Sequence, residues 1–121
     1  MNDTYGNCKS LTNAVCGNGV EYMNNTYQNC TSLTIAACGP RVVNMSGTYR
    51  DCSNLKYPKS GPNVIDMYQT YCNCPNILYA VCGPQVKELK ETYMNCQGLI
   101  GAASGNQVIN MINTYQDCHA L

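Results

Sequence analysis

A Thr-Tyr pair that recurs every 22 residues constrains this chain more than any other sequence feature. The six pairs begin, without one insertion or deletion, at Thr4, Thr26, Thr48, Thr70, Thr92 and Thr114. With each Thr counted as position 0, Cys stands at +4, Leu or Ile at +7, Gly at +13, Val at +16 and Met or Leu at +19. A register this strict indicates a repeat protein, in which each unit is one module stacked on the next.

The column spacing predicts one coil of structure per repeat. Met at +19, the next Tyr at +1 and Cys at +4 are four and then three residues apart, which favours a short helical or 3₁₀ turn. The apolar or small residues from +7 to +12 predict a short strand, and Gly-Pro or Gly-Asn at +13 and +14 predicts a turn after it. We therefore expect residues 1–121 to form a single α/β repeat solenoid of about five and a half coils. A parallel sheet would lie on one face and short helical turns on the other, with like residues about 4.8 Å apart.

The inward-facing columns define the predicted core, because a single coil cannot bury its apolar side alone. Ten Tyr with no Phe and no Trp indicate that one aromatic position is reused in every coil. Asn or Asp at +3 predicts a polar ladder that satisfies backbone groups at the bend. The predicted core residues are Tyr27, Cys30, Leu33, Val42, Met45, Tyr49, Cys52, Leu55, Val64, Met67, Tyr71, Cys74, Tyr93, Cys96 and Leu99.

Two stretches carry a family resemblance. Residues 42–55 read Val-Val-Asn-Met-Ser-Gly-Thr-Tyr-Arg-Asp-Cys-Ser-Asn-Leu, and residues 27–34 read Tyr-Gln-Asn-Cys-Thr-Ser-Leu-Thr. They resemble BspA-type leucine-rich repeats, a surface-protein repeat whose units run Val-x-x-Met, an aromatic residue, then Asn-Cys-x-x-Leu. The resemblance covers essentially the whole chain. Tyr stands where Phe is usual, so each hydroxyl must find water or a partner.

The resemblance implies a non-enzymatic recognition or structural module. Such repeats occur in surface adhesins of bacteria and protists, and in structural or host-contact proteins of bacteriophages. It therefore implies a cell surface or a virion appendage, although the cysteine usage is also compatible with a reducing cytoplasm. An intracellular protein-interaction scaffold stays open as an alternative.

Positions +8, +9 and +11 of the predicted strand vary while the framework columns are kept. They are largely apolar and should point outward, which is typical of a contact surface for a protein or glycan ligand. Tyr57 and Tyr79 lie one repeat apart and have the side chains of contact anchors. The alternative is that these are ordinary scattered surface residues or are covered by neighbouring chain. The predicted binding residues are Ile35, Lys56, Tyr57, Leu78, Tyr79, Val81 and Ile100.

The ten cysteines are predicted to be mainly small buried thiols. Six stand at +4 and three at +12, where Ser60 and Ser104 replace Cys in other coils, so an obligate +4 to +12 disulfide is disfavoured. Cys72 at +2 is the exception, and we expect an exposed, reactive thiol there. Some disulfides or a metal site remain alternatives, and with them a thiol-based redox or metal-binding protein. No metal or other cofactor is predicted.

Charge and composition argue against several function classes. The seven basic and seven acidic residues give a formal net charge of zero, without the Lys/Arg cluster that nucleic acid requires. No apolar run approaches the ~20 residues that span a bilayer, so no membrane insertion is expected. His119 is the only His, and no Ser/His/Asp or Cys/His set can be argued from spacing, so we expect no enzyme.

The two ends of the repeat array lack a recognisable polar cap. The chain starts at +19 and stops at +7 of its repeat. Uncapped coils expose core residues and unpaired backbone. We therefore expect a protein to cover the ends, through self-assembly, a larger complex or a longer chain.

Overall fold

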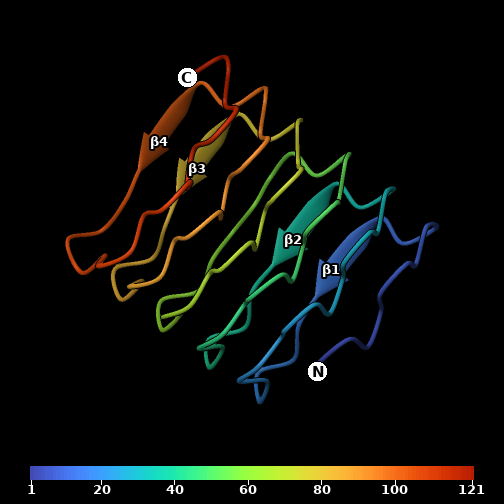
Figure 1. Cartoon of the computed structure of the whole chain (residues 1–121). Coiled ribbons are helices and arrows are strands. Elements are labelled where there is room, and N and C mark those ends of the chain that lie inside the picture. Colours follow the sequence, from blue (N-terminus) through green and yellow to red (C-terminus); the bar gives the residue numbers. More distant parts are fainter.

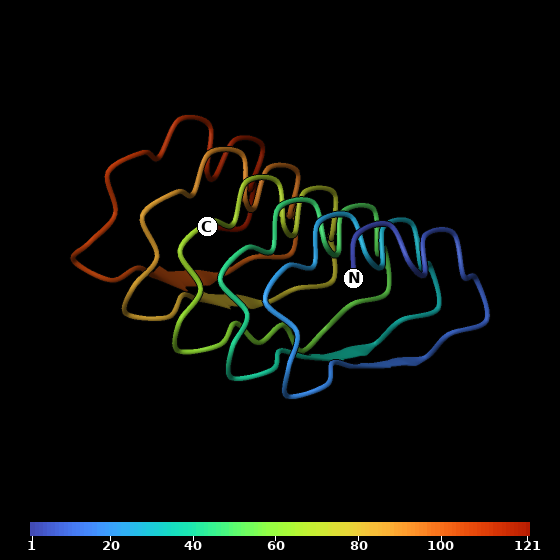
Figure 2. The ribbon, with the colours of Figure 1, turned by 90° about the horizontal axis from the view of Figure 1, so that it is seen from below.

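The computed structural model describes residues 1–121 as a stack of coils, each of which is one sequence repeat (Figure 1). Figure 2 shows the strands on one side of the stack and tightly looped turns on the other. β1 pairs with β2 and β3 with β4, in parallel and between residues 22 positions apart. The predicted solenoid with parallel strands on one face is thus confirmed. The strands are β1 (Asn13–Val15), β2 (Ile35–Ala37), β3 (Tyr79–Val81) and β4 (Gly101–Ala103).

The predicted helical turns do not form, and the face opposite the strands consists of consecutive β-turns. In the second coil, the N–H of Thr26 donates to the carbonyl of Met23 (3.1 Å) and that of Gln28 to Asn25 (3.3 Å). Asn25 and Asn29 both have left-handed φ angles, of 53° and 59°. Two left-handed residues per coil, at −1 and +3, are incompatible with a right-handed helix. The structure contains no helix of the length and hydropathy needed to cross a bilayer.

Every second N–H of this turn segment donates to the next coil, so the coils are joined on this face too. The N–H of Tyr27, for example, lies 2.9 Å from the carbonyl oxygen of Thr48. The side chains at +3 form the predicted polar ladder, but mainly with one another. Asn73 donates to Asp51 and Asn95 donates to Asn73, both at 2.7 Å. Asn and Asp recur at +3 because they tolerate the left-handed backbone better than other non-glycine residues.

The core consists of rows of like side chains, and all fifteen predicted core residues are at most 2% exposed. Six tyrosine rings, one per coil, stack in one row with centroids 5.4 to 5.9 Å apart. Five of the six residues in the Thr column, from Thr26 to Thr114, are also buried, which the sequence analysis missed. Thr70 Oγ1 donates to the carbonyl of Met45 (2.8 Å), and Cys74 Sγ donates to that of Tyr49 (3.1 Å). Both columns thus satisfy carbonyl groups of the preceding coil.

The tyrosine hydroxyls are satisfied unequally. The Tyr93 hydroxyl lies 3.6 Å from Cys82 Sγ, whereas those of Tyr49 and Tyr71 are buried with no hydrogen-bond partner in the protein. An unpaired buried hydroxyl loses its hydration without compensation. We therefore expect Tyr49→Phe and Tyr71→Phe each to raise the free energy of unfolding by about 1 kcal/mol in urea titrations. Tyr93→Phe is the control and should bring no gain. A loss of stability in both test variants would show that their hydroxyls are hydrogen-bonded.

Candidate binding site on the strand face

The strand side of the solenoid presents one row inward and two rows outward. Alanines at +10, such as Ala36 and Ala80, are buried, while their neighbours at +9 and +11 point outward. This is the side-chain alternation of a strand with one buried face. All seven residues predicted for binding have exposed side chains, which are Ile35, Lys56, Tyr57, Leu78, Tyr79, Val81 and Ile100.

The sheet is interrupted in the third coil. Pro58 occupies position +10, where the four other coils have Ala. Proline has no N–H to donate to a ladder, so it is excluded from the middle of a sheet. Only a single bridge, between Ile35 and Tyr57, joins the third coil to β2, and no backbone hydrogen bond joins residues 56–58 to residues 78–81. Two two-stranded sheets result instead of one.

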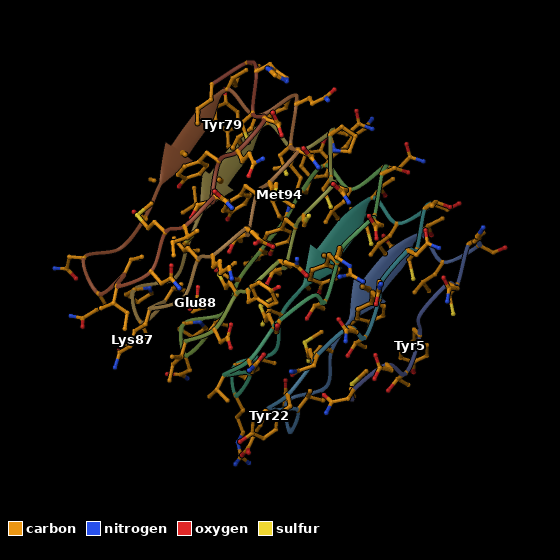
Figure 3. All side chains as sticks on the ribbon, in the orientation of Figure 1. Tyr5, Tyr22, Tyr79, Lys87, Glu88 and Met94 are labelled. Atoms are coloured by element: carbon orange, nitrogen blue, oxygen red, sulfur yellow. The ribbon has the colours of Figure 1, made fainter.

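A hollow of about 320 Å³ lies at this interruption. Five of the seven predicted binding residues line it, whereas Ile35 and Ile100 lie outside it on the same face. Pro58 is the member that the sequence analysis missed, although a lone proline in an alanine column was a visible signal. Figure 3 shows Tyr79 on the side of the molecule that carries β3 and β4. The lining residues are Lys56, Tyr57, Pro58, Leu78, Tyr79 and Val81.

The Tyr79 ring is positioned by the glycine next to it in the +9 row. A Cβ atom at Gly101 would lie 3.1 Å from Cδ1 of Tyr79, which is tighter than ordinary van der Waals contact. The ring therefore lies across Gly101 in the space that a side chain would occupy. Tyr79 is still 61% exposed, so one face of the ring remains available to a ligand.

The wall of the hollow contains backbone groups that the neighbouring coils would normally pair. Thr34 N–H donates to Thr12 (3.0 Å), and Ile100 N–H donates to Leu78 (2.8 Å). Between the third and fourth coils the equivalent bond, from the N–H of Leu78 to the carbonyl of Lys56, is absent, and neither group has a backbone partner. Two residues that line the hollow thus each carry a main-chain group without a backbone partner.

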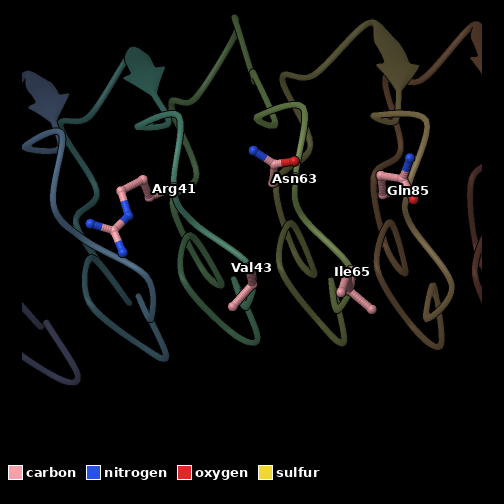
Figure 4. Close-up of a pocket in the computed structure, with 5 residues that line it drawn as sticks. All are labelled: Arg41, Val43, Asn63, Ile65 and Gln85. Atoms are coloured by element: carbon pink, nitrogen blue, oxygen red, sulfur yellow. The ribbon is translucent and has the colours of Figure 1, made fainter.

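A second hollow, of about 360 Å³, lies on another side of the stack. Figure 4 shows that its side chains come from successive coils and line one edge. Two of its polar groups are already engaged, because Arg41 forms an ion pair with Glu21 (2.6 Å) and Asn63 donates to the carbonyl of Pro40 (2.8 Å). Its lining consists of Arg41, Val43, Asn63, Ile65 and Gln85.

The prediction that Cys72 is exposed is wrong. Cys72 is 2% exposed, and its neighbours in the +2 column of the adjacent coils are the longer residues Arg50 and Met94. All ten cysteines are free thiols, and burial raises the pKa of Cys72 to about 11 and those of Cys52 and Cys96 to about 12. Such thiols carry little of the reactive thiolate near neutral pH. No group of three or more His, Cys, Asp or Glu side chains is placed to hold a metal ion.

No protein-family model matches the chain, and a search of curated proteins finds no match. The structure is similar to the crystal structure of a leucine-rich repeat protein from Bacteroides ovatus, with a TM-score of 0.82 and 14% sequence identity. The match covers 100% of this chain and 33% of that protein, so this chain spans about a third of its length. At this identity the likeness shows the fold, which is that of a leucine-rich repeat solenoid.

Proposed function

We propose that the chain is a non-enzymatic recognition module that binds a protein or glycan partner through its strand face, without turnover. The observation that carries this proposal is the hollow at the sheet break, which collects two exposed tyrosines and apolar side chains from adjacent coils. Exposed tyrosines beside apolar residues are typical of binding hot spots. Leucine-rich repeat solenoids also present extended surfaces that suit such contacts.

The resemblance to BspA-type repeats supports a place on a cell surface or a virion appendage. It rests on the recurring Val-x-x-Met and Asn-Cys-x-x-Leu spacing, which the structure places on successive coils. In such a setting the module would act by shape and by repeated contacts along the stack.

We also propose that protein covers the two ends of the stack, whether a longer chain, a second copy or another partner. Met111 in the last coil is 46% exposed, whereas Met45 and Met67 in the same row are fully buried. Contacts that extend the rows would bury this side chain. Sedimentation velocity over a range of concentrations would detect association between copies.

The binding proposal predicts the behaviour of a double variant, Tyr57→Ala with Tyr79→Ala. We expect the wild-type protein to select peptides from a phage-displayed random library or to bind sugars on a glycan array. The double variant should not bind these ligands. The free energy of unfolding should change by no more than about 0.5 kcal/mol per site, because both side chains are exposed surface residues. Tyr22→Ala is the matched control, since Tyr22 is 53% exposed but lies away from the strands. Ligands that survive the double variant, or no selected ligand in either format, would contradict the proposal.

A further inference from the structure

We infer that the hollow takes an apolar side chain from an acidic peptide segment of a partner protein, with carboxylates of that segment facing Lys56 and Lys59. This inference rests on the proposed function and names the chemical class of its ligand. Three features carry it: the distribution of charge around the coil, the lining of the hollow and the unpaired backbone groups in its wall.

Charge is distributed unevenly around the coil, although the whole chain is neutral. No carboxylate occurs at any position between +4 and +16, the part of the coil that contains the strand. Lys56 and Lys59 are exposed on the strand face and form no ion pair. A positive face without compensating acids favours an anionic partner. The seven carboxylates lie at −1, +3, +17 and +18, in Asp3, Glu21, Asp51, Asp66, Glu88, Glu91 and Asp117.

The lining of the hollow favours an apolar group at its centre. Pro58, Leu78 and Val81 provide aliphatic surface, and the two tyrosine rings provide aromatic walls. The volume of about 320 Å³ is at the lower end of the range for ligand pockets, which is about 300–1,000 Å³. It therefore suits one or two side chains better than an extended ligand. Lys56 at the edge places a positive charge beside this apolar centre.

The unpaired backbone groups favour a peptide over a sugar. The N–H of Leu78 and the carbonyl of Lys56 are one donor and one acceptor, which is the pair that a peptide main chain offers in return. A sugar would need several polar side chains to fix its hydroxyls, and the lining contains only Lys56 and the two tyrosine hydroxyls.

The test is the composition of peptides selected from a phage-displayed random dodecapeptide library on purified protein variants. The first bait is the wild type, and the second is Lys56→Glu with Lys59→Glu. The third, Lys9→Glu with Lys87→Glu, makes the same charge change at exposed lysines off the strand face. Selected peptides are then synthesised, and their affinity for each variant is measured by fluorescence anisotropy. Circular dichroism checks that each variant is folded.

We expect the wild type to select peptides with net negative charge around an apolar residue. Their affinity should fall about tenfold on the Lys56/Lys59 variant, since two surface ion pairs are lost. It should stay unchanged on the Lys9/Lys87 variant. Selected peptides that are neutral or basic, or whose binding ignores Lys56 and Lys59, would overturn the inference, yet would support the proposed function if they need Tyr57 and Tyr79. If the library yields no peptide and the glycan array yields acidic glycans whose binding needs Lys56 and Lys59, the peptide assignment alone is overturned.

Discussion

Tyr71→Ala should destabilise the middle of the stack, with an expected loss of about 3–5 kcal/mol in the free energy of unfolding. The Tyr71 ring is 1% exposed and stacks between Tyr49 and Tyr93, with centroid distances of 5.7 and 5.5 Å. Its removal leaves a cavity between two coils and weakens the contacts on both sides. In a solenoid these nearest-neighbour contacts provide most of the stability. We expect the melting temperature to fall by about 10–20 °C in calorimetry.

The matched control is Tyr79→Ala, which removes the same side chain from the surface. The two tyrosines are eight residues apart in the same coil, but Tyr79 is 61% exposed. Its removal should shift the free energy of unfolding by no more than about 0.5 kcal/mol. Equal losses for the two variants, or a larger loss for Tyr79→Ala, would show that the core and surface faces are assigned the wrong way round.

The second large effect is unfolding at alkaline pH. Burial raises the pKa of Cys52 and Cys96 from 9.0 to about 12, and that of Cys38 from 9.0 to about 11. Burial also raises the pKa of Tyr27 from 10.0 to about 12. A raised pKa in the folded state means that the unfolded chain releases its proton first. The contribution of these protonated thiols to the stability of the fold is therefore complete below pH 9, and it is lost as the pH rises from 9 towards 12.

The magnitude is large because several thiols act together. Each pKa unit corresponds to about 1.4 kcal/mol. At pH 11, two units above the pKa of an unfolded-state thiol, each strongly shifted thiol therefore lowers the free energy of unfolding by roughly 3 kcal/mol. Cys52 and Cys96 together therefore remove about 6 kcal/mol at pH 11, which is comparable to the roughly 5–15 kcal/mol that stabilises a typical domain. We expect cooperative unfolding at about pH 10–11, in which loss of the circular dichroism signal coincides with thiolate and tyrosinate absorbance. Gradual ionisation of most thiols near pH 9 in a still-folded chain would show that they are exposed, as the redox alternative requires.

The sequence predicted the core rows because burial in a solenoid follows the repeat directly. A residue such as Leu55 must face inward in its coil if its equivalents do in every other coil. The turn conformation was harder to predict, since a spacing of four and three residues fits a helical turn and a chain of β-turns alike. The distinguishing signal was Asn or Asp at +3 in every coil, as in Asn29, together with Asn, Asp or Gly at −1 in four of six coils, as in Asn25. Gln69 and Glu91 occupy −1 in the other two coils and have left-handed backbones as well, so the signal at −1 was weaker.

The candidate site could be predicted only in part, because it depends on an exception to the repeat. Outward positions such as Tyr57 and Tyr79 follow from strand alternation. That the two line one hollow beside a broken ladder follows from Pro58, whose effect on the pairing with the next coil becomes clear only from the hydrogen bonds. The prediction that Cys72 is exposed was wrong for a similar reason. Cys72 is a small residue in a column that otherwise holds Gly, Gln, Arg and Met, and a column of mixed sizes does not reveal whether one member is buried.

The most direct test of the stacked coils is a set of nuclear Overhauser contacts measured by solution NMR on isotope-labelled protein. Side-chain contacts should connect residues 22 positions apart along the whole chain, for example the Tyr49 ring with the Tyr71 ring, or Leu55 with Ile77. These contacts are expected in every row, from Tyr5–Tyr27 to Tyr93–Tyr115. A contact pattern without the 22-residue periodicity, or tyrosine rings that contact only solvent, would contradict it.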